Sequence, residues 1–450
     1  MLYLSRLLVH LISFASRLLN LGAGGSTAGK VVLFLYPGIV ERLADIYGGK
    51  IIFVTGTNGK STTSKLIAHL LSSEYNVIYN KTGANLIQGI TTLLLLNITA
   101  DKKNIPYAVL EIDELHLSTF GYRFNPAGIV FLNLFRDQMD RYGELDTVRS
   151  KWEAMLRKLD NVTVYLNADD PNINSLKNIK KTISFGISKG FSYTQQTQMA
   201  KDSILCPVCH ANLDFHKTVY SHIGDFTCPK CGFNNIDKDL QLLSYEKNII
   251  ILSSKQSLTP ITLKLPFDGI HNAYNTLAAV ALAEDIGIEL EQAKLQTLLD
   301  DFELPFGRME TITLPRGGML KLYLIKNPVG ASQSLQIIKE NIKNDDKLII
   351  AINNNTVDGI DVSWLWDITV PQIDNRIWVC GRRAAAMAAR LSHADLEDNI
   401  DTVEHSIEKV FDNILTDKAD HYFIANYTSM IEIQNIMKAK KIKGAGYWNG

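Results

Sequence analysis

A predicted strand, a glycine-rich turn and a predicted helix follow one another without a break at residues 51–71, and this unit constrains the fold more than any other. Residues 51–55 (IIFVT) are β-branched or aromatic and predict a buried strand, while residues 64–71 have helical spacing. The turn between them, GTNGKST, aims several backbone N–H groups and the positive end of a helix dipole at one point. We therefore predict a P-loop that binds a nucleoside triphosphate.

Two residues of this turn have roles that the P-loop pattern defines. Lys60 is expected to reach the β- and γ-phosphates of ATP, and Ser61 is expected to be a ligand of Mg²⁺. The standard pattern has glycine where this chain has Val54, so the motif is a variant form. The remaining residues of the expected phosphate cradle are Gly56, Thr57, Asn58, Gly59 and Thr62.

The segment that precedes the P-loop holds a second, weaker match. Residues 24–30 (GGSTAGK) fit the glycine and lysine positions, but no Ser or Thr follows Lys30 and no strand comes before, so we predict a plain loop. Residues 1–20 are apolar but interrupted by Arg6, His10 and Arg17. A helix that packs on its own domain is the first interpretation, and an interfacial membrane helix or a signal peptide are the alternatives.

Acidic residues cluster after the next apolar strand, residues 107–112 (YAVLEI). They are Glu111, Asp113 and Glu114. Further strands are predicted at 128–132 and 162–166, alternating with helices, so the sheet should be parallel. A carboxylate at the carboxyl end of such a strand, beside a P-loop, commonly holds the Mg²⁺ of a nucleotide, and we assign this role to Glu111. An exposed acidic cluster without a ligand is the alternative.

Four of the five cysteines form two Cys-x-x-Cys pairs, Cys206/Cys209 and Cys228/Cys231. This spacing is typical of a structural Zn²⁺ site with four thiolates and no open position, and it favours a reducing compartment. The fifth, Cys380, closes an apolar strand and is expected to be buried and unreactive. A net charge of −1 gives no argument for nucleic-acid binding, and no uninterrupted apolar run predicts a transmembrane helix.

Two asparagines stand three positions apart at the start of an alanine-rich helix. Asn272 and Asn275 would lie on one face of that helix and could hydrogen-bond an adenine edge, or one could simply cap the helix. Arg308 follows a break at Pro305 and could clamp a phosphate. The length predicts two or three domains, and residues from about 312 onward predict a second α/β domain with strands at 319–325, 347–352, 377–380 and 421–426.

These motifs together resemble the Mur ligase family, whose members use ATP to form amide bonds in peptidoglycan precursors. The resemblance rests on GTNGKST at 56–62, the strand-end Glu111, NADD at 167–170, GIHNAYN at 269–275 and Gly307-Arg308. Within the family, FRDQMDRYGE at 135–144, KNPVG at 326–330 and DGIDVSWLWD at 358–367 are similar to the MurT type of ligase subunit. The segment that holds a uridine nucleotide in other members has no counterpart here, which would suit a lipid-linked substrate.

The resemblance implies an architecture. Residues 1–310 would form a P-loop ATPase domain of the central Mur ligase type, with a zinc ribbon inserted at 200–240. Residues 311–450 would form a Rossmann-like α/β domain that contacts a glutaminase.

The resemblance also implies a reaction, in which ATP activates the α-carboxylate of D-glutamate in the stem peptide of lipid II as an acyl phosphate. Ammonia from a separate GatD-type class I glutaminase subunit would then give D-isoglutamine. The enzyme would be cytoplasmic and act at the inner face of the membrane. Lys60, Glu111 and Arg308 would be the catalytic residues of the ligase, and Asp361, or Asp358 as second choice, would complete the partner's Cys–His pair.

The residues independently favour a separate source of ammonia, because glutamine hydrolysis needs an activated thiolate and none of the five cysteines suits that role. Either a glutaminase on another chain supplies the ammonia, or free ammonia serves. Two other hypotheses stay open: a Mur-like or folylpolyglutamate-like ligase that adds an amino acid, and a non-catalytic nucleotide switch. Many Mur ligases carry a carbamylated lysine, and Lys151 lies close to the matching place with a slightly different spacing. On that basis we do not assign carbamylation to Lys151.

Overall fold

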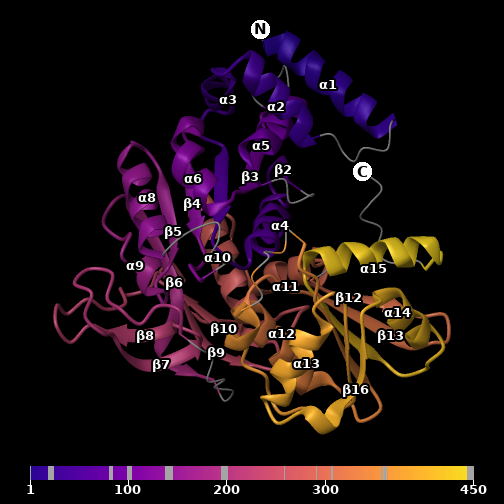
Figure 1. The fold of residues 1–450 in the computed structure, drawn as a ribbon. Coiled ribbons are helices and arrows are strands. Elements are labelled where there is room, and N and C mark those ends of the chain that lie inside the picture. The colour runs from indigo at the N-terminus through magenta and orange to yellow at the C-terminus, as the bar shows by residue number, and fades with distance from the viewer. Residues whose placement is uncertain are drawn as a thin grey trace.

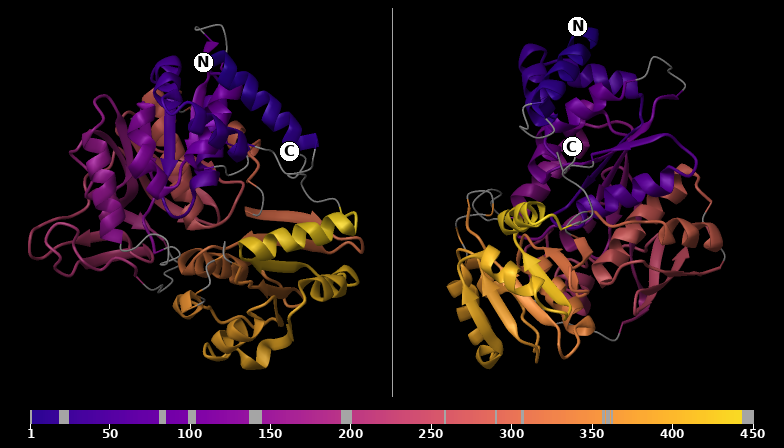
Figure 2. Two further views of the ribbon diagram at one scale, coloured as in Figure 1. Left: turned by 45° about the horizontal axis from the view of Figure 1, so that its top comes forward. Right: turned by 90° about the vertical axis from the view of Figure 1, so that its right-hand side faces the viewer.

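The computed structural model describes residues 2–18, 25–80, 85–98, 104–136, 145–193, 201–257, 259–289, 291–305, 308–355, 358, 361 and 363–442. The side chains of residues 15–18, 25 and 308 also lie outside this description. A nine-stranded sheet, a six-stranded sheet and a two-stranded hairpin make up the β-structure of the described residues. Figures 1 and 2 show the six-stranded sheet at the end of the molecule away from the N-terminus.

The nine-stranded sheet has the order β11-β10-β9-β6-β5-β4-β1-β3-β2. Its strands are β1 (Ile51–Thr55), β2 (Val77–Tyr79), β3 (Tyr107–Glu111), β4 (Gly128–Phe131), β5 (Thr163–Asn167), β6 (Lys181–Ser192), β9 (Leu240–Glu246), β10 (Ile249–Ser254) and β11 (Ile261–Lys264). Neighbours from β2 to β9 run parallel, and only the pairs β9–β10 and β10–β11 are antiparallel, so β10 alone runs against the other strands. The chain runs from β1 outward to β2 and returns through β3 to β4 on the other side of β1. The strand order thus reverses at β1, where ligands of open α/β sheets bind.

Helices cover both faces of this sheet, and that burial explains the unbroken apolar sequence of β1. Ile52 and Val54 pack with α4 (Lys60–Leu71), α10 (Ile270–Ile286) and α11 (Gln292–Asp300), whereas Ile51 and Phe53 pack into the opposite core. The opposite face is covered by α1 (Leu2–Leu18), α2 (Gly25–Leu35), α3 (Ile39–Tyr47), α5 (Ile87–Leu96), α6 (Glu114–Phe120), η2 (Gly121–Phe124), α8 (Leu145–Arg157) and α9 (Pro171–Asn174).

The six-stranded sheet has the order β12-β13-β17-β14-β15-β16. Its strands are β12 (Arg308–Thr313), β13 (Met319–Leu324), β14 (Lys347–Ala351), β15 (Ile377–Cys380), β16 (Ile400–Glu404) and β17 (His421–Ala425). Only β12 is antiparallel to its neighbour. One face packs on α12 (Pro328–Asn341), η3 (Ser363–Asp367) and α13 (Ala384–Ser392), the other on α14 (Ile407–Leu415) and α15 (Tyr427–Ala439); η4 is Glu397–Asn399.

The predicted α/β organisation is confirmed, and each strand named from the sequence is present with its ends shifted by at most a residue or two. The five strands β13 to β17 have the chain order 1-5-2-3-4, so the sheet is open and parallel but lacks the standard Rossmann order. The change from the nine-stranded to the six-stranded sheet falls between Asp300 and Arg308. The division into domains at 310 stays a prediction.

The predicted loop at residues 24–30 is wrong, because Gly25–Leu35 is helix α2. The glycine that imitates a P-loop instead allows α2 to lie close to α5. A Cβ atom on Gly29 would be 1.8 Å from the backbone oxygen of Gln88. Lys30 is exposed on the outer side of α2. Small residues at a helix crossing and glycines of a phosphate loop look alike in sequence, and the two can be distinguished only from their packing in the structure.

Among the described residues, α1 packs as a helix on its own unit, as the first interpretation expected, with Val9 fully buried. A search of the same residues finds no helix both long and apolar enough to cross a bilayer.

Gly29→Ala is expected to destabilise the protein. Alanine favours a helix by up to about 1 kcal/mol over glycine, but the clash with a backbone atom forces α2 and α5 apart, and overpacking of this kind costs about 1–3 kcal/mol. The melting temperature followed by circular dichroism should fall. The control is Gly190→Ala, where a Cβ meets nothing within 4 Å and little change is expected. A variant at Gly29 that melts with the parent would contradict the close packing.

Candidate active site

The turn after β1 has the backbone of a phosphate-binding loop, and it requires glycine at two positions. Gly56 has φ 138° and Gly59, which precedes the first residue of α4, has φ 88°. A Cβ on Gly56 would be 2.9 Å from the oxygen of Asn133, and one on Gly59 would be 2.3 Å from Oδ1 of Asn275. The N-terminus of α4 therefore opens directly onto the loop, where backbone N–H groups can bind an anion.

The loop is held by the segment that follows β4. Asn133 accepts a hydrogen bond from Asn58 N–H (2.9 Å) and donates one to Asn58 O (3.1 Å), so one amide side chain fixes both sides of that residue. Thr57 is fixed in the same way by Phe135, whose N–H donates to Thr57 Oγ1 (2.9 Å) and whose oxygen accepts from it (3.1 Å). The loop geometry is thus set before a ligand arrives. Sequence reasoning assigned no role to Asn133.

Lys60 is buried, and its ammonium group contacts the loop and one acid. Nζ donates to the backbone oxygens of Gly56 and Thr57 (3.2 Å for Thr57) and lies 3.1 Å from Oε1 of Glu114, which is also buried. The charge of Lys60 is therefore balanced inside the protein by Glu114. The sequence placed Glu114 in the acidic cluster but did not pair it with Lys60.

Ser61 and Glu111 meet at the end of β3, where the sequence predicted a magnesium site. Ser61 Oγ donates to Glu111 Oε2 at 2.7 Å. The Asn80 side chain fixes the backbone of Glu111 with hydrogen bonds of 2.9 and 2.8 Å. A hydroxyl and a carboxylate oxygen side by side at a P-loop suit the oxygen preference of Mg²⁺. Asp113 instead caps α6 by accepting from Leu115 N–H (3.0 Å), so it has a structural role.

Asn272 and Asn275 lie on one face of α10, as predicted, and the structure shows that this face points to the P-loop. Asn275 Nδ2 donates to Asn272 Oδ1 (3.1 Å), and Asn272 Nδ2 donates to Asp268 O (2.7 Å). Both residues line a cavity together with Gly59. The opposite wall comes from β13 and α12, with Tyr323, Leu324, Gly330, Gln333, Ser334 and Ile337.

A pair of side-chain hydrogen bonds joins the two walls of this cavity. Asn327, the residue that caps α12, exchanges hydrogen bonds with Asn58 of the P-loop at 3.3 and 3.1 Å. Its Oδ1 also accepts from Gly330 N–H at 2.9 Å. A ligand on the P-loop would therefore lie between the nine-stranded sheet and the six-stranded sheet.

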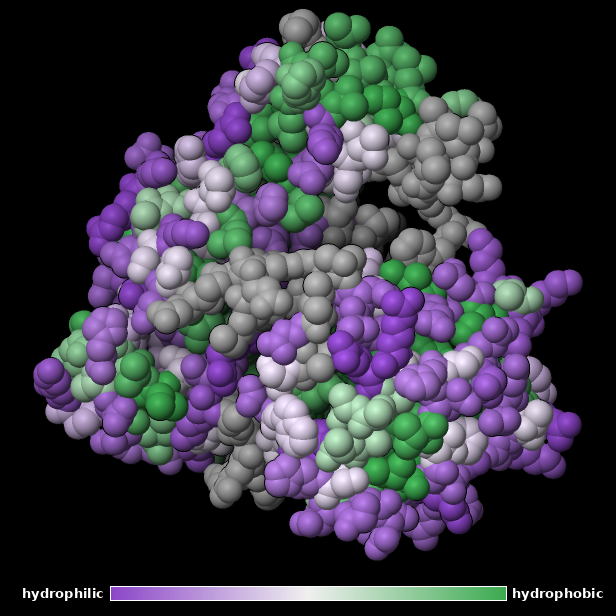
Figure 3. Space-filling view, viewed as in Figure 1, coloured by the Kyte–Doolittle hydropathy of each residue, from purple (hydrophilic) through white to green (hydrophobic). Residues whose placement is uncertain are grey.

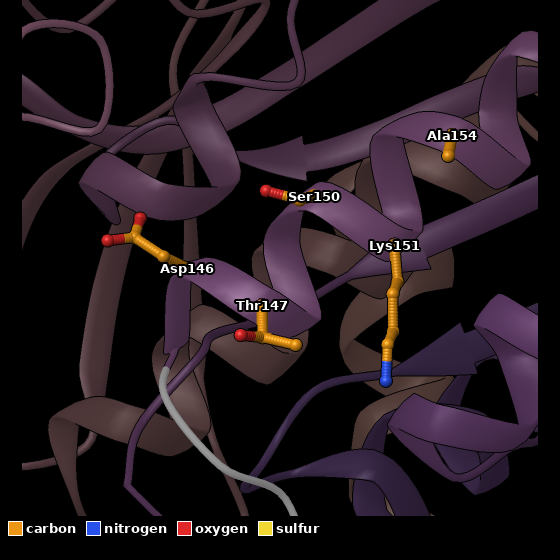
Figure 4. Close-up of a pocket in the computed structure, with 5 residues that line it drawn as sticks. All are labelled: Asp146, Thr147, Ser150, Lys151 and Ala154. Atoms are coloured by element: carbon orange, nitrogen blue, oxygen red, sulfur yellow. The ribbon is translucent and has the colours of Figure 1, made fainter.

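The predicted phosphate clamp, Arg308, has its side chain outside the described ones, and Gly307 lies outside the described residues. Lys151 is exposed on α8 beside an open hollow lined by Asp146, Thr147, Ser150 and Ala154. Figure 4 shows Thr147 and Lys151 pointing to the same side of the helix. The predicted segment FRDQMDRYGE falls mostly on residues 137–144, outside the described residues.

The four cysteines converge, with their sulfur atoms within 4.8 Å of one another. Cys206 Sγ lies 3.7 Å from Cys231 Sγ, and Cys209 Sγ lies 3.5 Å from Cys228 Sγ. A tetrahedral Zn²⁺ with Zn–S bonds of about 2.3 Å places its sulfurs ~3.8 Å apart. The four sulfur positions therefore fit this ion.

The hairpin β7 (Asp214–Tyr220) and β8 (Ile223–Thr227) links the cysteine cluster to the P-loop region. His222 at its tip is fully buried, lies 3.4 Å from the Asp170 carboxylate and packs on Phe135, with ring centroids 4.8 Å apart. Phe135 in turn holds Thr57. None of the nearby histidines belongs to the sulfur cluster.

Asp169, from the predicted NADD motif, is fully buried at the end of β5. It accepts hydrogen bonds from Tyr274 Oη (2.8 Å) and Ile187 N–H (2.6 Å) and pairs with Lys238 at 3.0 Å. Burial raises the pKa of this carboxyl, and the charge of Lys238 opposes that rise. Asp169 thus joins α10 to the strand that leads into the cysteine segment, which is a structural role.

The two aspartates after β14 differ in environment. Asp358 is buried and accepts from Thr428 N–H (2.9 Å) and Asn355 N–H (3.2 Å). Asp361 is exposed, and hydrogen bonds from Ser363 N–H (2.8 Å) and Oγ (2.9 Å) hold its pKa below the usual value. Cys380 is fully buried, and burial raises the pKa of its thiol, as the prediction of an unreactive cysteine requires.

Comparison with solved structures shows the fold of Mur ligases. A pseudomurein peptide ligase type C from Methanothermus fervidus superposes with a TM-score of 0.65 at 20% identity, over 87% of this chain and 78% of that one. MurF from Thermotoga maritima in complex with ADP gives a TM-score of 0.60 at 12% identity, over 91% of this chain and 83% of that one.

Sequence comparison is more specific. Family models of the Mur ligase middle domain and of the MurT ligase C-terminal match residues 54–228 and 324–430. The lipid II isoglutaminyl synthase (glutamine-hydrolyzing) subunit MurT of Streptococcus pneumoniae is 35% identical over 94% of each chain. Its counterpart from Staphylococcus aureus is 31% identical over 90% of each chain. The chain is therefore a Mur ligase and belongs to the family of MurT subunits.

Proposed function

We propose that this chain is the ATP-dependent ligase subunit of a lipid II isoglutaminyl synthase. Its substrate is the α-carboxylate of D-glutamate in the stem peptide of lipid II, which it converts to the amide of D-isoglutamine at the cytoplasmic face of the membrane. The observation that carries the proposal is the 35% identity over 94% of the chain to a protein of that name. A P-loop with Ser61 and Glu111 beside it supports the ATP-dependent part.

In the proposed reaction an oxygen of the carboxylate attacks the γ-phosphorus of ATP, the bond to the bridging oxygen breaks, and ADP leaves. Ammonia then attacks the acyl carbon, phosphate departs with the oxygen that the carboxylate supplied, and the nitrogen loses a proton. The backbone N–H groups of residues 56–62 and Lys60 would stabilise charge on the transferred phosphoryl group. Ser61 and Glu111 would hold Mg²⁺, which offsets phosphate charge when bound.

Asn272 and Asn275 would bind the adenine, since their amides line the cavity beside Gly59. Arg308 would contact the phosphates from the start of β12. The ribose and adenine would then contact the residues of β13 and α12 that form the far wall. In that arrangement both sheets contribute to one nucleotide site.

A partner glutaminase of the GatD type would supply the ammonia. Glutamine hydrolysis needs an activated thiolate, and among the described cysteines Cys380 is buried and the other four cluster together. Asp361 is the better candidate than Asp358 for completing the partner's Cys–His pair. It is exposed, whereas Asp358 is buried and committed to the backbone around Thr428.

The assignment is tested with the purified chain, a glutaminase partner, ATP, Mg²⁺, glutamine and lipid II. Mass spectrometry of the product should show a carboxamide in place of one carboxylic acid of the stem peptide. A gain of one amino-acid residue would instead favour the alternative, a Mur-like or folylpolyglutamate-like ligase. An unchanged acceptor would contradict both.

Lys60→Ala should reduce ATP turnover and amidation by roughly 10²–10³-fold, because it removes a cation from the transferred phosphoryl group. Steady-state kinetics with saturating glutamine measures the effect. Lys50→Ala is the matched control, since Lys50 precedes the same strand and bonds Ile105 O at 2.8 Å, away from the loop. Equal losses in the two variants would show that the effect does not come from the P-loop.

Asp361→Ala should abolish most glutamine-dependent amidation while amidation with high external ammonium stays largely intact. The acid would act on the partner's hydrolysis of glutamine and not on the ligase reaction. Rates with each nitrogen source are compared in one preparation of the complex. Asp358→Ala is the companion variant. Because it removes buried hydrogen bonds of Asp358, it should lower the stability of the protein and the amidation rates with both nitrogen sources. Should Asp361→Ala lower both rates equally, Asp361 is not the triad residue.

The cysteine cluster would hold structural Zn²⁺ in a closed site of four thiolates, which contributes to folding and not to chemistry. Cys231→Ser should lose the metal and lower the melting temperature of the protein. Elemental analysis of the purified chain measures the zinc content. Cys380→Ala is the control and should retain the ion. Zinc content that is unaffected by Cys231→Ser would rule out this site.

A further inference from the structure

Helix α1 exposes an apolar face that no described part of the chain covers. Side chains at every third or fourth position point outward along one side of the helix. They are Tyr3 (85% exposed), Leu4 (61%), Leu7 (56%), Leu11 (58%) and Phe14 (67%). The opposite side packs inward through Ser5, Val9 and Ser13. The helix is thus apolar on the side that faces solvent as well as on the side that packs inward, whereas an ordinary surface helix is polar toward solvent.

Helix α2 extends the same surface through Phe34 (84% exposed) and Leu35 (60%). Of the fifteen large apolar side chains that are exposed among the described residues, seven lie in α1 and α2. Figure 3 shows the resulting apolar region over these helices, at the top of the molecule. Single exposed apolar residues are ordinary, but a contiguous group of this kind marks an interaction surface. We call these seven residues the α1–α2 surface.

The charge of this segment favours an anionic partner. The first forty residues contain Arg6, Arg17 and Lys30 and no aspartate or glutamate, although the whole chain has a net charge of −1. Lys30 is exposed and Arg6 is half-buried beside the apolar side chains. Aromatic and aliphatic residues with nearby cations and no acids are what a helix in the interface of an anionic bilayer requires.

The α1–α2 surface and Asp361 lie in different parts of the molecule. α1 and α2 lie at the end opposite the six-stranded sheet in Figures 1 and 2. Asp361, the residue proposed to meet the glutaminase, belongs to the segment between β14 and β15 of that sheet. Asp361 therefore belongs to the part of the chain built on the six-stranded sheet, whereas α1 and α2 pack on the nine-stranded sheet.

We propose that the α1–α2 surface docks this chain on an anionic lipid bilayer, with α1 lying in the interface. The side chains of Tyr3, Leu7 and Phe14 enter the boundary between headgroups and acyl chains, and Arg6 and Lys30 contact anionic headgroups. The consequence for catalysis rests on the proposed function: docking brings the P-loop site to a lipid-linked carboxylate that stays in the membrane. Binding to lipid itself does not depend on that function.

The test uses the full chain, alone and with its glutaminase partner, in co-sedimentation with vesicles of phosphatidylcholine containing phosphatidylglycerol. The protein should bind these vesicles, bind pure phosphatidylcholine less, and dissociate as salt rises. The double substitution Leu7→Glu/Leu11→Glu should weaken binding at least about tenfold, since it puts acids into the apolar face. The matched control is Ile249→Glu/Val403→Glu, two comparably exposed apolar residues (45% and 51%) outside α1 and α2, which should bind like the parent.

Any one of four results overturns the proposal. The first is that the parent chain fails to bind vesicles of either composition, and the second is that the double variant binds them like the parent. The third is that the partner glutaminase abolishes vesicle binding, which would show that the glutaminase itself docks on the α1–α2 surface. The fourth is a dimer, detected by light scattering, that the parent chain and the control variant form and the Leu7→Glu/Leu11→Glu variant does not. This result would assign the surface to a second copy of the chain.

Two activity measurements separate this proposal from the proposed function. The double variant should amidate a water-soluble substrate with the stem peptide at the parental rate and amidate lipid II in vesicles more slowly. Equal rates on lipid II in vesicles would contradict a role for docking even if binding is lost. If vesicle binding follows the prediction but no substrate is amidated, the docking surface stands and the proposed function fails.

Discussion

Two hydrogen bonds between the Asn133 side chain and the backbone of Asn58 fix the P-loop, and the rest of the site depends on the conformation of that loop. A phosphate loop acts through N–H groups that must point at one place before the ligand arrives, because ordering them during binding would cost affinity. Asn133 follows β4, so this constraint ties the loop after β1 to the neighbouring strand of the same sheet. Gly56 and Gly59 adopt φ angles that other residues avoid, and their missing Cβ atoms let Asn133 and Asn275 approach.

The same loop also meets the second sheet. Asn58 is held from one side by Asn133 and from the other by Asn327 at the N-terminus of α12. Any rotation of the six-stranded sheet relative to the nine-stranded sheet would therefore displace the P-loop. A nucleotide bound between the two sheets would contact both. The hairpin of the cysteine segment adds a third support, since His222 packs on Phe135 and Phe135 holds Thr57. The supports of the P-loop thus come from the segment after β4, from α12 and from the cysteine hairpin.

The sequence predicted the features that local pattern controls. The P-loop unit, the strand ends with Ser61 and Glu111, the cysteine pairs and the face of α10 that carries Asn272 and Asn275 all depend on short spacings. It did not predict the pairing of Lys60 with Glu114 or of Asn58 with Asn133, because these partners lie 54 and 75 positions apart and their contact depends on strand register. A short pattern also misled at Gly29, where the glycine serves helix packing. Residues 1–20 were expected to pack on their own domain, with an interfacial membrane helix or a signal peptide as alternatives, and the structure shows how much of α1 faces outward.

The central claim is that the P-loop site transfers a phosphoryl group to a carboxylate. The direct test is amidation of a stem-peptide substrate whose α-carboxylate carries heavy oxygen, with the released phosphate examined by mass spectrometry. An acyl phosphate requires that the phosphate carry one labelled oxygen for each amide formed. Phosphate without label, formed at the same rate as the amide, would show that ATP is hydrolysed without activating the carboxylate and would contradict the account.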